Sequence, residues 1–241
     1  MRTILGVEFP EDPIDINVGE LSSSTTKKMV VLTNDSSIAN PCGEALEQHF
    51  SLTKVGSITI GSIVVSEIFS GVDNLVLIRS VTRVPEGRCM EYMRRVLTLL
   101  SPSCVIVLDS VTAYSYVGTP GAAESLQFVT SSNVELSVAE NIKGSRRLPV
   151  GNVLTGATAA TLNYCEPRVL SCYALLVLRE ASYTPQAASV LAQGALPFIS
   201  TVMSRQGGDQ AVRAIPQPDQ RSLVERAKRD AFMMATANIY T

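Results

Sequence analysis

The stretch Cys104-Val-Ile-Val-Leu-Asp109 is a continuous apolar run that ends in a carboxylate. A run of this length without polar alternation is typical of a strand covered on both faces, as in a parallel sheet. A second run, Cys172-Tyr-Ala-Leu-Leu-Val-Leu178, has the same character. The two runs therefore predict two central strands of one buried sheet.

Further strands and helices alternate with these two runs along the chain. Short segments rich in Val, Ile and Leu predict more strands, and apolar residues at helical spacing predict the intervening helices. The predicted strands are 29–33, 57–69 (two strands around a turn at Gly61) and 74–79, and the predicted helices are 86–100, 152–164 and 185–202. This alternation predicts an α/β domain, with a single, mostly parallel twisted sheet and helices on both faces.

Changes in composition predict the domain boundaries. Prolines and a Ser/Thr run make 1–27 a poorly structured leader, and 28–204 form the α/β core domain. Glycines, prolines and glutamines make 205–221 a linker or loop. Residues 222–241 are predicted to form a C-terminal helix followed by an extended tail.

Composition excludes several classes of function. The 22 acidic and 20 basic residues nearly cancel, so no field for nucleic acid is expected. No uninterrupted apolar run reaches the roughly 20 residues of a membrane span. The five cysteines have no CxxC spacing, which disfavours a zinc or redox site and favours reduced core thiols. We therefore expect a cytoplasmic protein, or one shared with the nucleus, without metal or cofactor.

Catalytic groups are scarce in the sequence. His49 is the only histidine and belongs to the end of a predicted helix, where a structural role is expected. Gly118-Thr-Pro-Gly121 lacks the lysine of a phosphate-binding loop. Asp109 is the best single carboxylate, because ligands of open α/β sheets bind at strand ends. Helix capping or a turn hydrogen bond explains Asp109 equally well, so no catalytic residue is predicted.

The last three residues, Ile239-Tyr240-Thr241, combine an apolar side chain, a tyrosine and a terminal carboxylate. A chain end can enter a pocket that no loop can enter, and capture of a C-terminal carboxylate is a recurrent recognition mode. The alternative is an ordinary frayed terminus. A generic ligand of a carboxylate-capturing domain is disfavoured, because such domains usually prefer an apolar last residue.

Two stretches of the sequence resemble the proteasome assembly chaperone family. The first comprises Leu148-Pro-Val-Gly-Asn152, Ala159-Ala-Thr-Leu-Asn-Tyr-Cys165 and Leu175-Leu-Val-Leu178, and the second is Asn238-Ile-Tyr-Thr241. The resemblance implies a fold related in shape to nucleoside phosphorylases without their activity. It implies a heterodimer with a related chain, proteasome assembly chaperone 2, on the outer face of the proteasome α-ring.

The resemblance also implies roles for the tail in a pocket between adjacent proteasome α subunits. Ile239 would fill an apolar recess, Tyr240 would pack and hydrogen-bond at the pocket mouth, and the Thr241 carboxylate would pair with a pocket lysine. The short leader departs from the family, since it lacks the acidic extension of some members. The sequence therefore predicts a non-enzymatic chaperone of proteasome assembly. The alternative is a nucleoside phosphorylase- or hydrolase-like enzyme with Asp109 in its site.

Overall fold

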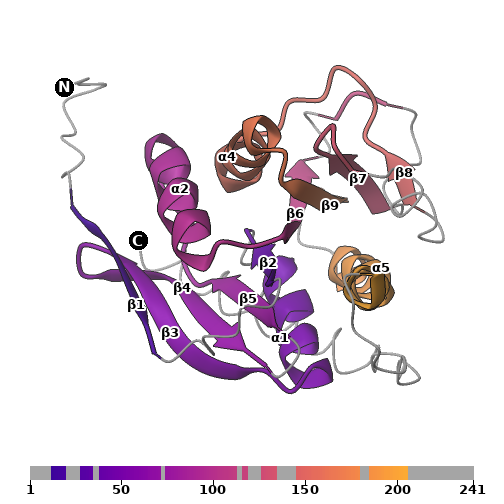
Figure 1. Ribbon diagram of the computed structural model, residues 1–241. Coiled ribbons are helices and arrows are strands. Elements are labelled where there is room, and N and C mark those ends of the chain that lie inside the picture. The colour runs from indigo at the N-terminus through magenta and orange to yellow at the C-terminus, as the bar shows by residue number, and fades with distance from the viewer. Residues whose placement is uncertain are drawn as a thin grey trace, which may run out of the picture.

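The described residues fold around one nine-stranded sheet. The computed structural model describes residues 12–19, 28–34, 38–71, 74–112, 116–118, 126–134, 145–179 and 185–205. Its strands are ordered β1-β3-β4-β5-β2-β6-β9-β7-β8 (Figure 1). They are β1 (Ile14–Val18), β2 (Met29–Thr33), β3 (Thr53–Ile60), β4 (Ile63–Ser70), β5 (Leu75–Ser80), β6 (Cys104–Thr112), β7 (Leu126–Thr130), β8 (Ser145–Arg147) and β9 (Ser171–Arg179).

The four central strands, β5, β2, β6 and β9, run parallel to one another. Antiparallel pairing extends the sheet through β4, β3 and β1 at one end and through β7 at the other. The longest central pairing joins β6 to β9, from Cys104 opposite Ser171 to Thr112 opposite Arg179. These two strands contain the two apolar runs of the sequence, and the predicted α/β fold class is confirmed.

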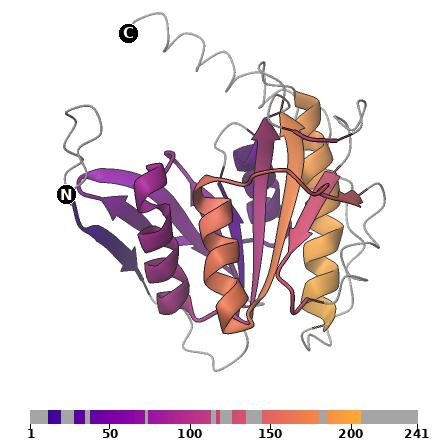
Figure 2. The same ribbon diagram turned by 90° about the horizontal axis from the view of Figure 1, so that it is seen from above.

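Helices cover both faces of the sheet. They are α1 (Ala39–His49), α2 (Cys89–Leu100), α4 (Gly156–Cys165) and α5 (Pro185–Arg205), with short 3-10 turns at Glu86–Arg88 and Glu166–Arg168. Helices α2 and α4 lie side by side on one face, and α1 and α5 lie on the other (Figures 1 and 2). Because side chains alternate along a strand, Ile106 packs into the core beneath α1 and α5, and Val107 packs beneath α2 and α4.

The predicted elements and the observed ones agree in the centre of the chain. The predicted strands at 29–33, 57–69 and 74–79 correspond to β2, the β3–β4 pair and β5, and the predicted helices correspond to α2, α4 and α5. Helix α4 begins at Gly156 rather than at residue 152. Its small residues allow it to approach the sheet closely, and Ala160 and Thr161 are buried.

The prediction that the whole leader is poorly structured is wrong for residues 14–18, which form β1. The apolar alternation Ile14, Ile16, Val18 directs one face of this strand toward α2. Strands β7 and β8 and most of α1 were also not predicted. The predicted linker after Arg205, the C-terminal helix and the tail lie outside the described residues.

Helix α5 has the length and composition of a membrane span, with a mean hydropathy of 1.3 over Ala187–Arg205. Half of that segment is buried within the domain. Its predicted core residues Ala187, Leu191, Ala195 and Phe198 pack beneath the sheet, and Val190 is partly buried against them. The apolar character of α5 is therefore explained by its place in the core.

Candidate functional site

The chain reverses its direction of travel across the sheet at β2. From β2 the chain passes through β3 and β4 to β5 on one side, and α2 then carries it back to β6 on the other. The carboxyl ends of β2 and β6 therefore lie at the point where this direction changes, which is the usual ligand position in open α/β sheets. A cavity of about 510 Å³ lies there, between these strand ends and the start of α4.

Asp109 lies in this cavity, at the carboxyl-end portion of β6, as the sequence predicted. The Thr158 hydroxyl donates a hydrogen bond to Asp109 Oδ2, and the Ser110 amide donates to Oδ1 at 2.8 Å. Asn34, directly after β2, donates from Nδ2 to Thr158 Oγ1 at 2.9 Å. One carboxylate therefore ties the first turn of α4 to the ends of β6 and β2.

Other polar groups of the cavity also bond to one another. Tyr92 donates its hydroxyl proton to Ser66 Oγ at 2.8 Å, and burial raises the pKa of Tyr92 to about 12. The Ser80 amide donates to Thr33 Oγ1 at 3.1 Å. Arg83, at the rim, forms an exposed ion pair with Glu86 at 2.7 Å. This arrangement stabilises the cavity, and Tyr92 stays protonated at neutral pH.

His49 is the last residue of α1 and does not line the cavity. Its ring meets the Phe50 ring edge-on at 4.7 Å between centroids, and partial burial lowers the pKa of the imidazole. This packing agrees with the structural role predicted for it. Among the described residues, no group of three or more His, Cys, Asp and Glu side chains could hold a metal ion.

All five cysteines are free thiols and are buried, as predicted for core residues. Cys165 at the end of α4 and Cys172 on β9 hydrogen-bond to each other. This bond lowers the pKa of Cys165 and raises that of Cys172 well above its ordinary value, where burial adds to the effect. Burial alone raises the pKa of Cys42 to about 12. The raised pKa values keep Cys42 and Cys172 protonated at neutral pH, and the buried thiols act as small core side chains.

The predicted partner-binding residues Ile239, Tyr240 and Thr241 lie outside the described residues. The described part adds a surface that sequence reasoning missed. Val117, Val150 and Val153, here called the apolar rim, are 54%, 99% and 73% exposed. The Asn152 side chain accepts from the Val117 amide and donates to the Val117 carbonyl, both at 2.8 Å. The two bonds to Asn152 hold Val117 next to the loop that carries Val150 and Val153.

The segment Leu148–Asn152, which carries part of the family resemblance, contributes Val150 to the apolar rim. The sequence did contain one indication of this surface, the motif Leu148–Asn152, because its Asn152 forms both hydrogen bonds to Val117. The pairing partner could not be found from sequence, because it lies 35 residues away along the chain.

No family model and no curated protein sequence matches this chain. Solved structures do match it over nearly its full length. PbaB of Pyrococcus furiosus, an archaeal proteasome activator, has a TM-score of 0.65 and 14% identity, covering 95% of this chain and 99% of its own. PbaA of the same organism, an archaeal homolog of proteasome-assembly chaperone, has a TM-score of 0.61 and 13% identity, covering 94% and 100%.

A proteasome-assembly chaperone homologue of Mycobacterium tuberculosis also matches. Its TM-score is 0.53 at 12% identity, and the match covers 85% of this chain and 94% of the homologue. Likeness at these identities establishes a shared fold. The coverage of both chains means that the shared unit is the whole domain and not a common substructure.

Proposed function

We propose that this protein is a non-enzymatic chaperone for assembly of the proteasome core particle, in the role of proteasome assembly chaperone 1. The observation that carries the proposal is the full-length fold match to an archaeal homolog of proteasome-assembly chaperone and to an archaeal proteasome activator. The ending Ile239-Tyr240-Thr241 supports it independently, because it is the tail type that the family resemblance implies. Its expected location is the cytoplasm and also the nucleus.

The proposed complex is a heterodimer with proteasome assembly chaperone 2 on the outer face of the α-ring. The tail enters a pocket between adjacent α subunits: Ile239 occupies an apolar recess, Tyr240 packs at the mouth, and the Thr241 carboxylate meets a lysine. Ordering each backbone residue costs about 1–2 kcal/mol. Two buried side chains and one ion pair offset that cost for three residues but leave little surplus.

Tight binding therefore needs a second contact that acts together with the tail. The apolar rim is exposed, and Asn152 fixes the position of the Val117 backbone within it, so it can supply such a contact at a reduced ordering cost. A chaperone that binds through two weak contacts is also released readily once assembly changes either of them.

The first experiment measures binding of the heterodimer to purified proteasome α-rings by surface plasmon resonance. Three variants are compared: deletion of 239–241, Tyr240→Ala, and a single glycine added after Thr241. The added glycine keeps both side chains and displaces only the carboxylate. We expect each variant to weaken binding at least about tenfold, which is the loss of about 1.4 kcal/mol.

Asn238→Ala is the matched control, since Asn238 precedes the three residues. It is expected to bind as the unmodified protein does. All variants are expected to keep the same thermal unfolding midpoint and the same heterodimer in gel filtration. Unchanged affinity of all three tail variants would remove the tail from the proposal, and loss of the heterodimer would assign the defect to folding.

A second candidate, an enzyme acting on nucleosides, is supported by the cavity of about 510 Å³ around Asp109 at the carboxyl ends of β2 and β6. It predicts release of free base from nucleosides, with or without inorganic phosphate, and loss of that turnover in Asp109→Ala. The hydrogen bonds from Thr158 and Ser110 give Asp109 a structural role that needs no turnover. Sustained base release by the unmodified protein would favour the enzyme.

A further inference from the structure

Strand β1 is an edge strand whose outer hydrogen-bonding groups alternate with those that bond to β3. The Gly61 amide donates to the Pro13 carbonyl at 3.1 Å, and the Gly19 amide donates to the Val55 carbonyl at 2.7 Å. Both bonds show that the odd-numbered residues of this segment form the hydrogen-bonded pairs with β3. The backbone groups of Ile14, Ile16 and Val18 therefore point away from β3, toward the open edge.

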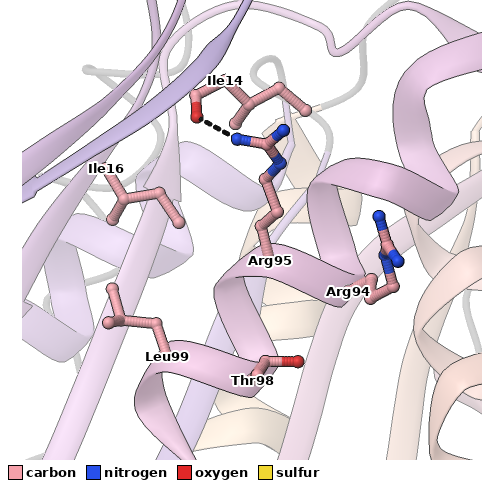
Figure 3. A pocket seen from close by; sticks show the side chains of 6 residues that line it. All are labelled: Ile14, Ile16, Arg94, Arg95, Thr98 and Leu99. Carbon is pink, nitrogen blue, oxygen red and sulfur yellow. Dashed lines mark hydrogen bonds between the residues drawn. The ribbon is translucent and has the colours of Figure 1, made fainter.

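Two arginines of the adjacent helix region already bond to the first part of this edge. Arg88 Nη2 donates to the Asp12 carbonyl at 2.9 Å, and Arg95 Nη1 donates to the Ile14 carbonyl at 2.9 Å (Figure 3). No described residue bonds to the outward amides and carbonyls of Ile16 and Val18. The second half of the edge is thus a template for one more strand.

A shallow groove of about 520 Å³ runs between this edge and α2. Its lining includes Ile14 and Ile16 of β1 and Arg94, Thr98 and Leu99 of α2, and Figure 3 shows Leu99 on the side of the groove facing Ile16. Leu99 is 53% exposed. An added strand would cover an apolar surface as well as satisfy backbone groups.

Residues 4–9, Ile-Leu-Gly-Val-Glu-Phe, match the requirements of that strand. In an antiparallel strand beside β1 with Val7 opposite Ile16, Leu5 falls opposite Val18 and Phe9 opposite Ile14. All three then share the face that contacts α2, because residues two apart lie on one face. Ile4, Gly6 and Glu8 fall on the other face, beside the exposed Asp15 and Asn17.

The chain also reaches the groove at the correct place and with the correct charge. Residues 10–13 join this segment directly to β1, and a loop of four residues is common in hairpins. Glu11, in the connection, brings a carboxylate to an edge flanked by Arg88, Arg94 and Arg95. Arg94 has no ion pair with any described residue, so it is available to this carboxylate.

We propose that residues 4–9 of this same chain add to β1 as a tenth, antiparallel strand, with Val7 opposite Ile16 and Leu5 opposite Val18. The segment fills the groove between β1 and α2, covers Leu99 and pairs the outward backbone groups of Ile16 and Val18. It then replaces β1 as the edge strand of the sheet, and Glu8 places a charge on that edge, which disfavours edge-to-edge association.

The test is hydrogen exchange resolved to single amides on the full-length protein at two concentrations. The amides of Ile16 and Val18 are expected to exchange at least about 100-fold more slowly than unprotected amides, because they would be bonded to the leader. Deletion of 2–9 is expected to abolish this protection, and a synthetic peptide of residues 2–12 is expected to restore it. Fast exchange in the full-length protein would overturn the proposal. Protection that rises with protein concentration would assign the edge to a second copy and would overturn it as well.

Substitutions on the two faces of the segment separate pairing from a general effect of the leader. Val7→Asp places a charge in the groove and is expected to remove the protection of Ile16. Ile4→Asp, on the opposite face, is the matched control and is expected to preserve it. Equal effects of the two substitutions would contradict the assigned register.

An engineered disulfide checks the register without relying on exchange. Gly6 and Asn17 would form a non-hydrogen-bonded pair with Cα atoms about 4.5 Å apart, within the disulfide range. Gly6→Cys with Asn17→Cys is expected to form an intramolecular disulfide on mild oxidation, detected by peptide mapping. Val7→Cys with Asn17→Cys places the thiols on opposite faces and is expected to stay reduced. The reverse result would overturn the proposed pairing.

Discussion

At the scale of single residues, the carboxylates of this domain act as structural anchors. Asp109 accepts hydrogen bonds from Thr158 and from the Ser110 amide, so its charge is held at the first turn of α4. A carboxylate near a helix N-terminus is also favoured by the helix dipole. Glu67 on β4 is a second anchor, because its carboxylate forms ion pairs with both Lys54 and Arg79 at 2.7 Å.

Thr158→Val tests the anchor at Asp109. The substitution keeps the shape of a buried side chain and removes its hydroxyl, which leaves one oxygen of Asp109 and the Asn34 amide without this partner. We expect a loss of about 1–3 kcal/mol in the free energy of unfolding, measured by urea denaturation. Thr155→Val, just before α4, is the control and is expected to cost less.

Glu67→Gln tests a pH-dependent contribution. Burial raises the pKa of Glu67, but its hydrogen bonds and charges with Lys54 and Arg79 outweigh burial and leave the pKa lowered. A carboxyl whose folded pKa is lowered stabilises the protein above its unfolded pKa of about 4.3, and this contribution is lost as the pH falls through the folded pKa. We expect a loss of about 1 kcal/mol at pH 7, allowing for solvent screening.

The unfolding free energies of the unmodified protein and Glu67→Gln are also compared at pH 3. There the two proteins are expected to differ much less, because the carboxyl is becoming protonated in both the folded and the unfolded state. Glu86→Gln is the matched control, since its pair with Arg83 is 64% and 75% exposed and is expected to contribute almost nothing. A constant difference at both pH values would show that charge is not the cause.

Residue-scale sequence reasoning found Asp109 but not its partners. The position at the end of an apolar strand was readable because it depends only on local pattern. Thr158, in α4, lies 49 residues from Asp109, and Asn34 follows another strand, β2. Only the order of the strands in the folded sheet brings the three residues together. Asp109 has a structural role, but not as a helix cap or in a turn: its carboxylate accepts from the Thr158 side chain in α4 and from the Ser110 amide within β6.

At the scale of elements, the errors fall where tertiary packing outweighs local preference. Strand β1 follows Pro13 and precedes Gly19, and its five residues alternate correctly but are few. Helix α1 contains Pro41 and Gly43, both poor helix formers, and is held by its buried residues. Strand β8 has only three residues. The long periodic elements, α2 and α5, were predicted because their own sequences specify them.

Gly56→Ala tests the attachment of β1. A Cβ at Gly56 would lie 2.2 Å from the Asn17 carbonyl oxygen, which is backbone and cannot rotate away. We expect β1 to move from β3, at a cost of about 2 kcal/mol in unfolding free energy, with faster exchange of the Asp15 and Asn17 amides. Gly87→Ala is the matched control, because a Cβ there meets nothing within 4 Å. Equal stability of the two variants would contradict the close approach.

Pro197→Ala tests the interior of α5. Proline lacks the amide that would bond one turn back, and its side chain here is exposed, so alanine adds a hydrogen bond without disturbing the core. We expect a stabilisation of about 1 kcal/mol, seen as a higher thermal unfolding midpoint.

At the scale of the whole molecule, one sheet separates two cores. Residues of β6 alternate between them, with Ile106 and Leu108 on the α1–α5 side and Val105 and Val107 on the α2–α4 side. The sequence predicted this arrangement because a continuous apolar strand must be covered on both faces. It did not predict β1 and β7, two short antiparallel strands that are held by pairing with β3 and β9 rather than specified by periodicity.

The candidate functional features also differ in how far the sequence could predict them. The cavity follows from the topology, which the sequence pattern specified in outline, but its bonded network depends on contacts between distant segments. The tail 239–241 was recognised by its chemistry alone and stays a prediction. The apolar rim emerged only from the fold, because Asn152 holds Val117 across 35 residues of chain.

The two cores are expected to unfold together. Leu108→Ala removes methyl groups from the core beneath α1 and α5, and Val107→Ala removes them from the core beneath α2 and α4. We expect a loss of about 2–5 kcal/mol for Leu108→Ala and a smaller loss for Val107→Ala. Both neighbours belong to the same strand, so loss of either core frees β6 and exposes the other face. Each variant should therefore show a single thermal transition in which near-UV and far-UV circular dichroism coincide. Two separated transitions in either variant would show that the halves of the domain fold independently across the sheet.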